Sequence, residues 1–321
     1  MAAKPVVLVT RKLPKAVEDR LRRDYSARLN PEDALYSADE IVERAIGADA
    51  ILPCHTEKFT PEVIARLPDS VKIIANFSVG YDHVDVAAAK ERGLVVTNTP
   101  EVLSDATAEL TLMLMLGAAR RASEGERLVR TREWRDWSPS FMVGIQMTGK
   151  RLGIIGCGRV GQVVAERARG FDMEIHYTNR TPLPPEKEKG AIYHATPEAL
   201  LPNCDFLAIH CVATPETTGL LNAERLALLP DGAIITNAAR GAVIDDEALI
   251  AALKSGKVAA AGLDVFNNEP DIHPGYRELP NVFLMPHIGS ATRETRDAMG
   301  FRALDNLDAY FAGKEPRDRV A

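Results

Sequence analysis

The chain has 321 residues, a formal net charge of −6 and a pI near 5.7, so it lacks the basic surplus of a nucleic-acid-binding protein. Its 46% hydrophobic and 26% charged residues are ordinary for a globular protein, and its length favours two domains. The longest apolar run, residues 110–119, is about half of a bilayer span, and the N-terminal apolar run is too short for a signal peptide, so we expect a cytoplasmic protein with no membrane partner.

The first third of the chain alternates short β-rich runs with helical segments, which is the pattern of βαβ units. Each predicted helix is preceded by a hydroxyl residue that can cap it, Ser37 or Thr60. The predicted strands are residues 6–9, 50–52, 72–75 and 95–97, and the predicted helices are 38–46 and 61–67.

A break at residues 98–100 precedes a strongly apolar helix that we predict over 101–121. A helix that is apolar all round is buried on most sides, as it would be between two domains or two subunits. The basic stretch that follows is interrupted by glutamates and is predicted as a solvated helix and loop. Residues 133–139 carry both tryptophans, which we expect to pack against a partner subunit.

A second alternating series runs from 151 to 285 and is long enough for a complete doubly wound sheet. We predict a last helix over 292–312 that returns to the first domain, and an α/β fold overall. The four cysteines show neither CxxC pairing nor a histidine at metal-ligand spacing, so we expect free thiols and no metal site.

The glycine fingerprint G-C-G-R-V-G at 156–161 follows an apolar strand and opens an apolar helix. In a dinucleotide site Gly156 would form the tight turn, Gly158 would admit the pyrophosphate, and Gly161 would let the helix pack on the strand. The backbone N–H groups at the helix start, from Arg159 and Val160, would bind the phosphate charge.

The next strand ends in Asn179, Arg180 and Thr181, where an enzyme that binds NAD would carry an acidic residue. A carboxylate there would repel a 2′-phosphate, whereas an arginine with amide and hydroxyl donors would bind it. We therefore predict a preference for NADP(H) over NAD(H), although Arg180 also fits a simple surface charge at a strand end.

Three residues of complementary chemistry, Arg240, Glu269 and His287, each follow a separate apolar run. If those runs are parallel strands, their carboxyl ends meet at the crevice where open α/β sheets bind ligands. Taken singly each residue has an ordinary structural explanation; convergence on one crevice favours catalysis. The runs are residues 233–237, 259–265 and 282–285.

The surrounding motifs resemble the signature blocks of the D-2-hydroxyacid dehydrogenases. They are N-A-A-R-G at 237–241, L-D-V-F at 263–266 with Glu269-Pro270, P-H-I-G-S-A at 286–291, S-V-G-Y-D at 78–82 and N-T-P at 98–100. With residues 179–181, the chain is similar to the glyoxylate and hydroxypyruvate reductases of that family.

The resemblance implies two doubly wound domains hinged near 98–100 and 286–290. A flavodoxin-like substrate domain would comprise residues 1–98 and 288–321, and a Rossmann nucleotide-binding domain would comprise 99–287. The resemblance also implies a homodimer in which Trp137 reaches toward the neighbouring active site.

Hydride transfer to a 2-oxo acid needs an acid for the carbonyl oxygen and a cation for the carboxylate. His287 as imidazolium would be the acid, and Glu269 would orient it. Arg240 would clamp the carboxylate and polarise the carbonyl. The backbone N–H groups of Val79 and Gly80 would bind the carboxylate from its other side.

The remaining cofactor contacts are expected from Ala238, Ala239, Asp264 and Thr107, the last of which also suits helix packing. His55, His83 and His210 are predicted to be structural.

The sequence therefore predicts NADPH-dependent reduction of a small 2-oxo acid, such as glyoxylate or hydroxypyruvate, to the D-2-hydroxy acid. Two alternatives remain open: a dehydrogenase for a phosphoglycerate or aryl-pyruvate type of acid, and a non-enzymatic partner protein that senses dinucleotides.

Overall fold

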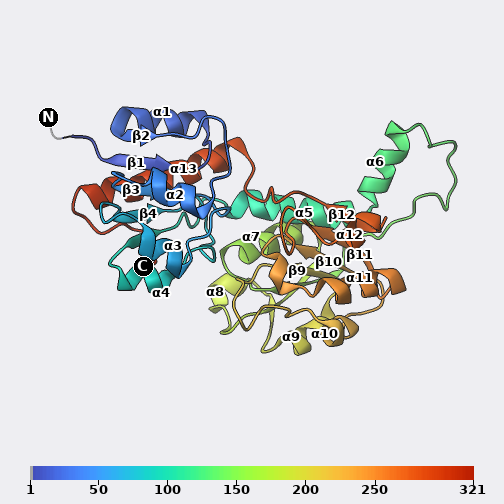
Figure 1. Ribbon diagram of the computed structural model, residues 1–321. Helices are drawn as coiled ribbons and strands as arrows, with labels where there is room; N and C mark the ends of the chain where they lie inside the picture. Colours follow the sequence, from blue (N-terminus) through green and yellow to red (C-terminus); the bar gives the residue numbers. More distant parts are fainter. Residues whose placement is uncertain (1–2) are drawn as a thin grey trace. The chain divides into compact units, whose positions relative to one another are not determined.

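In the computed structural model, which describes residues 3–321, the chain forms two compact α/β units (Figure 1). The first unit contains the residues up to Leu103 together with Ser290–Ala321, and the second contains Ser104–Gly289. The predicted return of the C-terminal segment to the first unit is confirmed. The boundaries predicted at 98/99 and 287/288 lie a few residues earlier in the chain than the division between these units.

The first unit is built on a five-stranded parallel sheet of order β2-β1-β3-β4-β5, the flavodoxin-like order. Short strand β2 was not predicted. The strands are β1 (Val6–Val9), β2 (Ser26–Arg28), β3 (Ala50–Leu52), β4 (Ile73–Ala75) and β5 (Val95–Thr97). The helices are α1 (Lys15–Asp24), α2 (Ala38–Arg44), α3 (Pro61–Arg66), α4 (Val86–Glu91) and α13 (Arg293–Phe311).

Both faces of this sheet are covered by helices, which is why its strands are apolar at successive positions. Val7 and Val9 face the core beneath α1 and α13, while Leu8 between them faces the core beneath α2, α3 and α4. The cap predicted at Ser37 is present, and Ser37 forms a capping box with Glu40 at the start of α2.

The second unit is built on a seven-stranded parallel sheet of order β12-β11-β10-β9-β6-β7-β8. All strands run parallel, but the order in which they follow one another along the chain reverses between β6 and β9. This is the Rossmann arrangement, and its ligand crevice lies outside the carboxyl ends of these two strands. The strands are β6 (Arg151–Ile155), β7 (Glu174–Thr178), β8 (Ile192–His194), β9 (Phe206–Ile209), β10 (Ala233–Asn237), β11 (Val258–Leu263) and β12 (Val282–Leu284).

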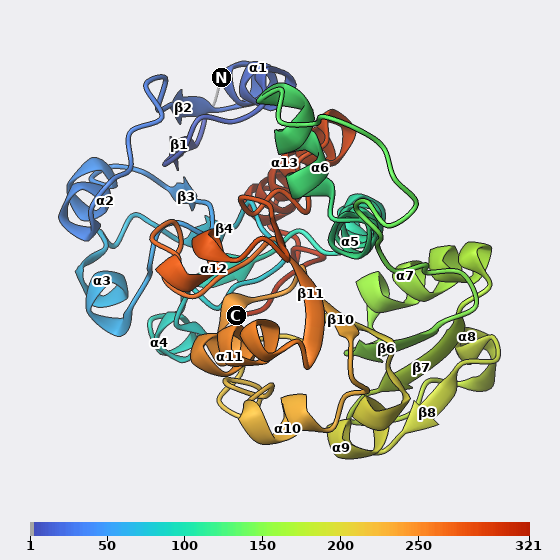
Figure 2. The same cartoon turned by 90° about the vertical axis from the view of Figure 1, so that its right-hand side faces the viewer.

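Helices cover both faces of the second sheet as well, with α5 and α7 on one side and α9, α10 and α11 on the other (Figure 2). Within residues 3–321, no helix is both long enough and apolar enough to cross a membrane. The main helices of this unit are α5 (Ser104–Ala119), α6 (Ala122–Arg130), α7 (Arg159–Ala168), α8 (Pro185–Glu188), α9 (Pro197–Leu200), α10 (Ala223–Ala227), α11 (Asp246–Ser255) and α12 (Pro274–Glu278).

The apolar helix predicted over 101–121 is shorter than expected, because the chain turns sharply after α5. Arg121 adopts a left-handed conformation, with φ of 55°, and α6 begins at the next residue. Most of α5 is buried, whereas no residue of α6 is buried. Helix α6 and the loop that follows it extend away from the rest of their unit (Figure 1).

Candidate active site

The three strands that precede the predicted catalytic residues are parallel neighbours. β10 pairs with β11, and β11 pairs with β12. At the carboxyl ends of these strands Asn237 is the register partner of Leu263, and Leu263 is the register partner of Leu284. The loops that carry Arg240, Glu269 and His287 therefore leave the same edge of one sheet. This confirms the strand arrangement predicted from the sequence.

His287 and Glu269 form a direct hydrogen bond, with 2.6 Å between His287 Nδ1 and Glu269 Oε2. An ionised carboxylate can only accept, so Nδ1 carries a proton and Nε2 is the nitrogen that can act on a substrate. The second oxygen, Glu269 Oε1, accepts from the N–H of Phe266 at 2.7 Å. The carboxylate is thus fixed at both oxygens, and it fixes the imidazole in turn.

Arg240 follows a tight turn at the end of β10. The Asn237 side chain accepts from the N–H of Ala239 at 3.0 Å and donates to the carbonyl of Arg240 at 2.9 Å. The guanidinium of Arg240 donates to the Ala239 carbonyl at 2.8 Å. Asn237 was part of the sequence motif but had no predicted role. An asparagine at the end of a strand commonly hydrogen-bonds the backbone of the turn that follows, and this preference could have predicted the role.

Gly241 allows the Arg240 turn to lie against the loop after β11. A Cβ at this position would lie 2.0 Å from the carbonyl carbon of Phe266, which no side chain tolerates. The same Phe266 backbone donates to Glu269. The absence of a side chain at Gly241 therefore lets the backbone of the Arg240 loop pack directly against the backbone of the Glu269 loop.

Asp264 connects β11 to the His287 loop. Its buried carboxylate accepts the N–H groups of Ile288 at 2.7 Å and Gly289 at 2.8 Å, and its backbone carbonyl accepts the N–H of His287 at 2.8 Å. Burial raises the pKa of Asp264, and the two backbone hydrogen bonds oppose that rise. Thr107 of α5 lies beside this loop, since a Cβ at Gly289 would be 3.6 Å from Thr107 Oγ1.

The glycine fingerprint forms the predicted strand-to-helix turn between β6 and α7. Gly156 has a φ of 90°, and a Cβ there would lie 2.5 Å from the backbone nitrogen of Cys211. Gly158 caps α7, and a Cβ there would meet nothing within 4 Å. Gly161 lies against Gly156, because a Cβ at Gly161 would be 2.7 Å from the Gly156 carbonyl oxygen. The turn is closed on its protein side and open at the helix N-terminus.

Comparison with known proteins identifies the family to which the chain belongs. Residues 112–289 match the D-isomer specific 2-hydroxyacid dehydrogenase, NAD binding domain. The chain is 43% identical over 315 residues to a glycerate dehydrogenase from Hyphomicrobium methylovorum, with 98% of each chain covered. The chain belongs to the D-isomer specific 2-hydroxyacid dehydrogenase family.

Two further relatives match nearly the whole chain. A glyoxylate reductase from Thermococcus litoralis is 40% identical, with 99% of this chain and 97% of the relative covered. The structure of an NADPH-dependent glyoxylate/hydroxypyruvate reductase from Sinorhizobium meliloti, in complex with NADP and malonate, is 33% identical with a TM-score of 0.88, covering 99% of this chain and 97% of the other. Because these relatives are enzymes, the non-enzymatic alternative is not favoured.

The residues after β7 of the dehydrogenase divide into two kinds. Asn179 is held against the glycine turn: Oδ1 accepts from the Cys157 N–H at 2.7 Å and Nδ2 donates to the Cys157 carbonyl at 3.3 Å. Arg180 and Thr181 are exposed. The Thr214 hydroxyl lowers the pKa of the Glu216 carboxyl, and the positive charge of Arg180 adds a smaller effect in the same direction. Arg180 therefore lies near Glu216.

Other predicted residues have simpler outcomes. All four cysteines are free, as expected, and burial raises the pKa of each thiol. His210 was predicted to be structural, and its buried Nε2 has no hydrogen-bond partner within residues 3–321. Val79 and Gly80 lie in the first unit, in the loop between β4 and α4, and both are partly buried.

Proposed function

We propose that this dehydrogenase reduces glyoxylate or hydroxypyruvate to the D-2-hydroxy acid with NADPH as the hydride donor. The observation that carries the proposal is the 2.6 Å hydrogen bond between His287 and Glu269, beside the Arg240 loop at the carboxyl edge of the nucleotide-binding sheet. The names of the relatives, glycerate dehydrogenase and glyoxylate reductase, support a small 2-oxo acid as substrate.

The dinucleotide would bind at the open glycine turn, where Gly158, Arg159 and Val160 present the N-terminus of α7 to the pyrophosphate. When bound, it supplies the hydride for C2 of the substrate. The fit rests on the space beside Gly158, which a side chain would fill. Thr107, Ala238, Ala239 and Asp264 are the residues proposed around its nicotinamide half.

His287 is proposed to protonate the carbonyl oxygen of the substrate through Nε2, because Nδ1 is committed to Glu269. The Glu269 carboxylate holds Nδ1 and its proton, so the proton that is delivered is the one on Nε2. As hydride reaches C2, the electron pair of the C=O bond moves to oxygen and takes the proton from Nε2. The ring is left neutral and regains its proton from solvent.

Arg240 is proposed to bind the substrate carboxylate with two parallel hydrogen bonds and to polarise the carbonyl. The Asn237 turn supports this role by fixing the backbone from which the guanidinium extends. The N–H groups of Val79 and Gly80 are proposed to bind the same carboxylate.

The exposed Arg180 and Thr181 are proposed to bind the 2′-phosphate of NADPH. The relative in complex with NADP supports this cofactor, while NAD(H) would bind more weakly because no acidic residue stands at this strand end to hold its ribose.

The test is an NADPH-oxidation screen with glyoxylate, hydroxypyruvate, pyruvate and phenylpyruvate, repeated with NADH. We expect the highest kcat/KM for glyoxylate or hydroxypyruvate with NADPH. In His287→Ala, turnover should fall by roughly 10²–10⁴ while NADPH binding persists. A greater kcat/KM for phenylpyruvate would contradict the substrate assignment, and near-normal turnover of His287→Ala would contradict the acid.

A homodimer is also proposed, because α6 and the loop after it expose apolar side chains that a single chain leaves uncovered. Val129, Trp134, Trp137 and Val143 are 62%, 55%, 71% and 63% exposed. A second copy of the chain would cover them, with Trp137 directed to the neighbouring active site. Light scattering should show a dimer, and a monomer at micromolar concentration would contradict it.

A further inference from the structure

The loop of the first unit that carries Val79 and Gly80 has an unusual distribution of hydrogen bonds. Three successive carbonyl groups are engaged: that of Ser78 accepts from the Thr99 N–H at 2.9 Å, that of Val79 from Asn98 Nδ2 at 2.8 Å, and that of Gly80 from Ser78 Oγ at 2.5 Å. Throughout residues 3–321, no group accepts a hydrogen bond from the N–H of Val79 or of Gly80.

These carbonyl contacts determine where the two N–H groups point. In a trans peptide the C=O and N–H bonds point in opposite directions. The Ser78 carbonyl shares its peptide with the Val79 N–H, and the Val79 carbonyl shares its peptide with the Gly80 N–H. Hydrogen bonds from Thr99 and Asn98 on one side therefore direct both N–H groups to the other side.

Asn98 is itself held by the C-terminal tail of the same unit. Its N–H donates to the Asp318 carbonyl at 3.2 Å, and its carbonyl accepts from Asn306 Nδ2 at 3.3 Å. The tail lies along the edge strand β5, since the N–H of Val320 donates to the Val96 carbonyl at 2.8 Å. Asn98 is only 8% exposed.

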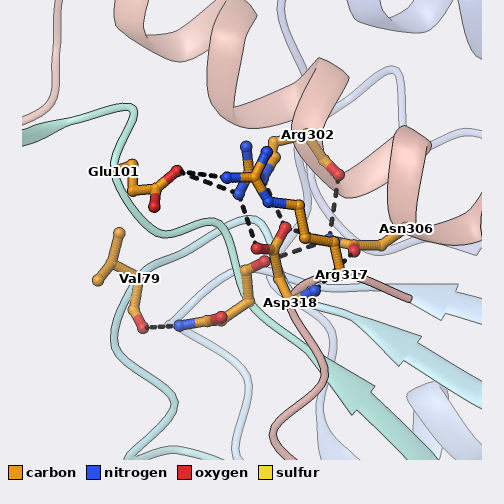
Figure 3. Close-up of polar contacts among 7 residues, drawn as sticks. Val79, Glu101, Arg302, Asn306, Arg317 and Asp318 are labelled. Carbon is orange, nitrogen blue, oxygen red and sulfur yellow. Dashed lines mark hydrogen bonds and ion pairs between the residues drawn. The ribbon is translucent and has the colours of Figure 1, made fainter. Parts of the chain in front are cut away.

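The Asp318 side chain fixes the tail to α13 (Figure 3). It accepts from Arg302 at Nε and Nη2, at 2.5 and 2.8 Å, and from Asn306 Nδ2 at 3.0 Å. Burial raises the pKa of Asp318, but the bonds from Arg302 and Asn306 outweigh it and the pKa lies below its ordinary value. Glu101 also accepts from Arg302 and from Arg317, at 3.3 and 3.1 Å.

We propose that Asn98 is a positioning residue for substrate binding, which, held by the Asp318 tail, aims the N–H groups of Val79 and Gly80 at the carboxylate of the 2-oxo acid. This inference rests on the proposed function, because it names how that carboxylate is received. It also assigns a role to the last residues of the chain, which contribute to substrate affinity through Asn98.

The first test measures loop position without activity. Amide hydrogen exchange of the peptide spanning residues 76–85 is followed by mass spectrometry in the wild type and in Asn98→Ala. Loss of the Nδ2 donor should accelerate exchange in this peptide by about tenfold, the effect of one lost hydrogen bond. Unchanged exchange would overturn the positioning role, whatever the substrate of the enzyme.

The second test measures the consequence for substrate binding. In Asn98→Ala we expect KM for glyoxylate and the inhibition constant of oxamate to rise about tenfold, with kcat within about threefold of wild type and NADPH affinity unchanged. Asp318→Asn, which weakens the tail but keeps the Asn98 amide, should raise KM by a smaller factor. A fall in kcat alone, or KM within twofold of wild type, would overturn the proposal.

Asn30→Ala is the matched control for a general loss of stability. Asn30 is a 2% exposed amide of the same unit whose Nδ2 donates to the carbonyls of Thr10 and Ala34 at 2.7 and 2.8 Å. Its replacement should lower Tm at least as much as Asn98→Ala and leave KM unchanged. An equal rise in KM would show that Asn98 acts through stability only. If the wild type reduces no 2-oxo acid, the proposed function fails, and the exchange result still decides the role of Asn98 in the loop.

Discussion

Replacement of Glu269 by glutamine would test the acid at the centre of the proposed reaction. Glu269 Oε1 accepts from the Phe266 N–H at 2.7 Å while Oε2 accepts from His287 Nδ1 at 2.6 Å. A glutamine has one acceptor oxygen for these two donors. If the oxygen stays with Phe266, the amide group donates to Nδ1, which must then be unprotonated, and the imidazolium form is lost.

The magnitude follows from the bond that is removed. A hydrogen bond between charged groups contributes about 1.5–3 kcal/mol, which corresponds to roughly a 10- to 100-fold change in rate. The pair is partly exposed, with 30% of the His287 side chain and 28% of that of Glu269 accessible, so we expect the lower part of this range. The measurement is kcat for glyoxylate with saturating NADPH.

A second histidine–carboxylate pair in the same unit provides the control. Glu247 lies 2.9 Å from His273 Nε2 and has no proposed part in the reaction. Glu247→Gln should leave kcat within about twofold of wild type, well inside the effect of one charged hydrogen bond. Turnover of Glu269→Gln at the level of Glu247→Gln would refute the role of the carboxylate in proton delivery.

Three further predictions concern cofactor choice, acid stability and the thiols. Arg180→Ala should lower the ratio of kcat/KM for NADPH to that for NADH by roughly 10- to 100-fold, and an unchanged ratio would reject the 2′-phosphate contact. Burial lowers the pKa of His210 from 6.5 to about 4, so as pH falls the unfolded chain binds this proton before the folded chain does, and the free energy of unfolding decreases from pH 6.5 toward pH 4. Urea titrations of His210→Gln should show a smaller decrease over this range, and an equal decrease would exclude His210 as the cause. Burial raises the pKa of Cys157 and of Cys204 to about 12, so iodoacetamide at about pH 8 should label them only after unfolding, and rapid labelling of the native protein would contradict their burial.

Much of the fold was predictable because its signals are local. Apolar runs flanked by capping residues and glycines located the central strands, and the Gly156 fingerprint placed the nucleotide turn. Strand β2, Ser26–Arg28, was missed because it carries one apolar residue and pairs along one edge only. The end of α5 was also misplaced, because the left-handed Arg121 has no local signal in an otherwise helical sequence.

The composition of the proposed site could be predicted from the sequence, but its geometry could not. Arg240, Glu269 and His287 were predictable as candidate residues because each follows a strand and the family motifs surround them. The contacts of Asn179 were not, because an amide after a strand suits a ligand and a turn equally well, and only the fold brings Cys157 to it. The role proposed for Asn98 likewise depends on Asn306 of α13 and Asp318 of the C-terminal tail, both more than two hundred residues further along the chain.

The position of the proposed acid depends on backbone contacts that cross between strands. His287 adopts a left-handed conformation with φ of 55°, which a non-glycine residue holds only when its surroundings fix it. Asp264 provides that constraint, since its carbonyl and both carboxylate oxygens accept the three successive N–H groups from His287 to Gly289. A buried carboxylate is unfavourable unless such donors surround it. Asp264 therefore links the strand next to β10 to the loop of the acid, and fixes the imidazole relative to the Arg240 loop.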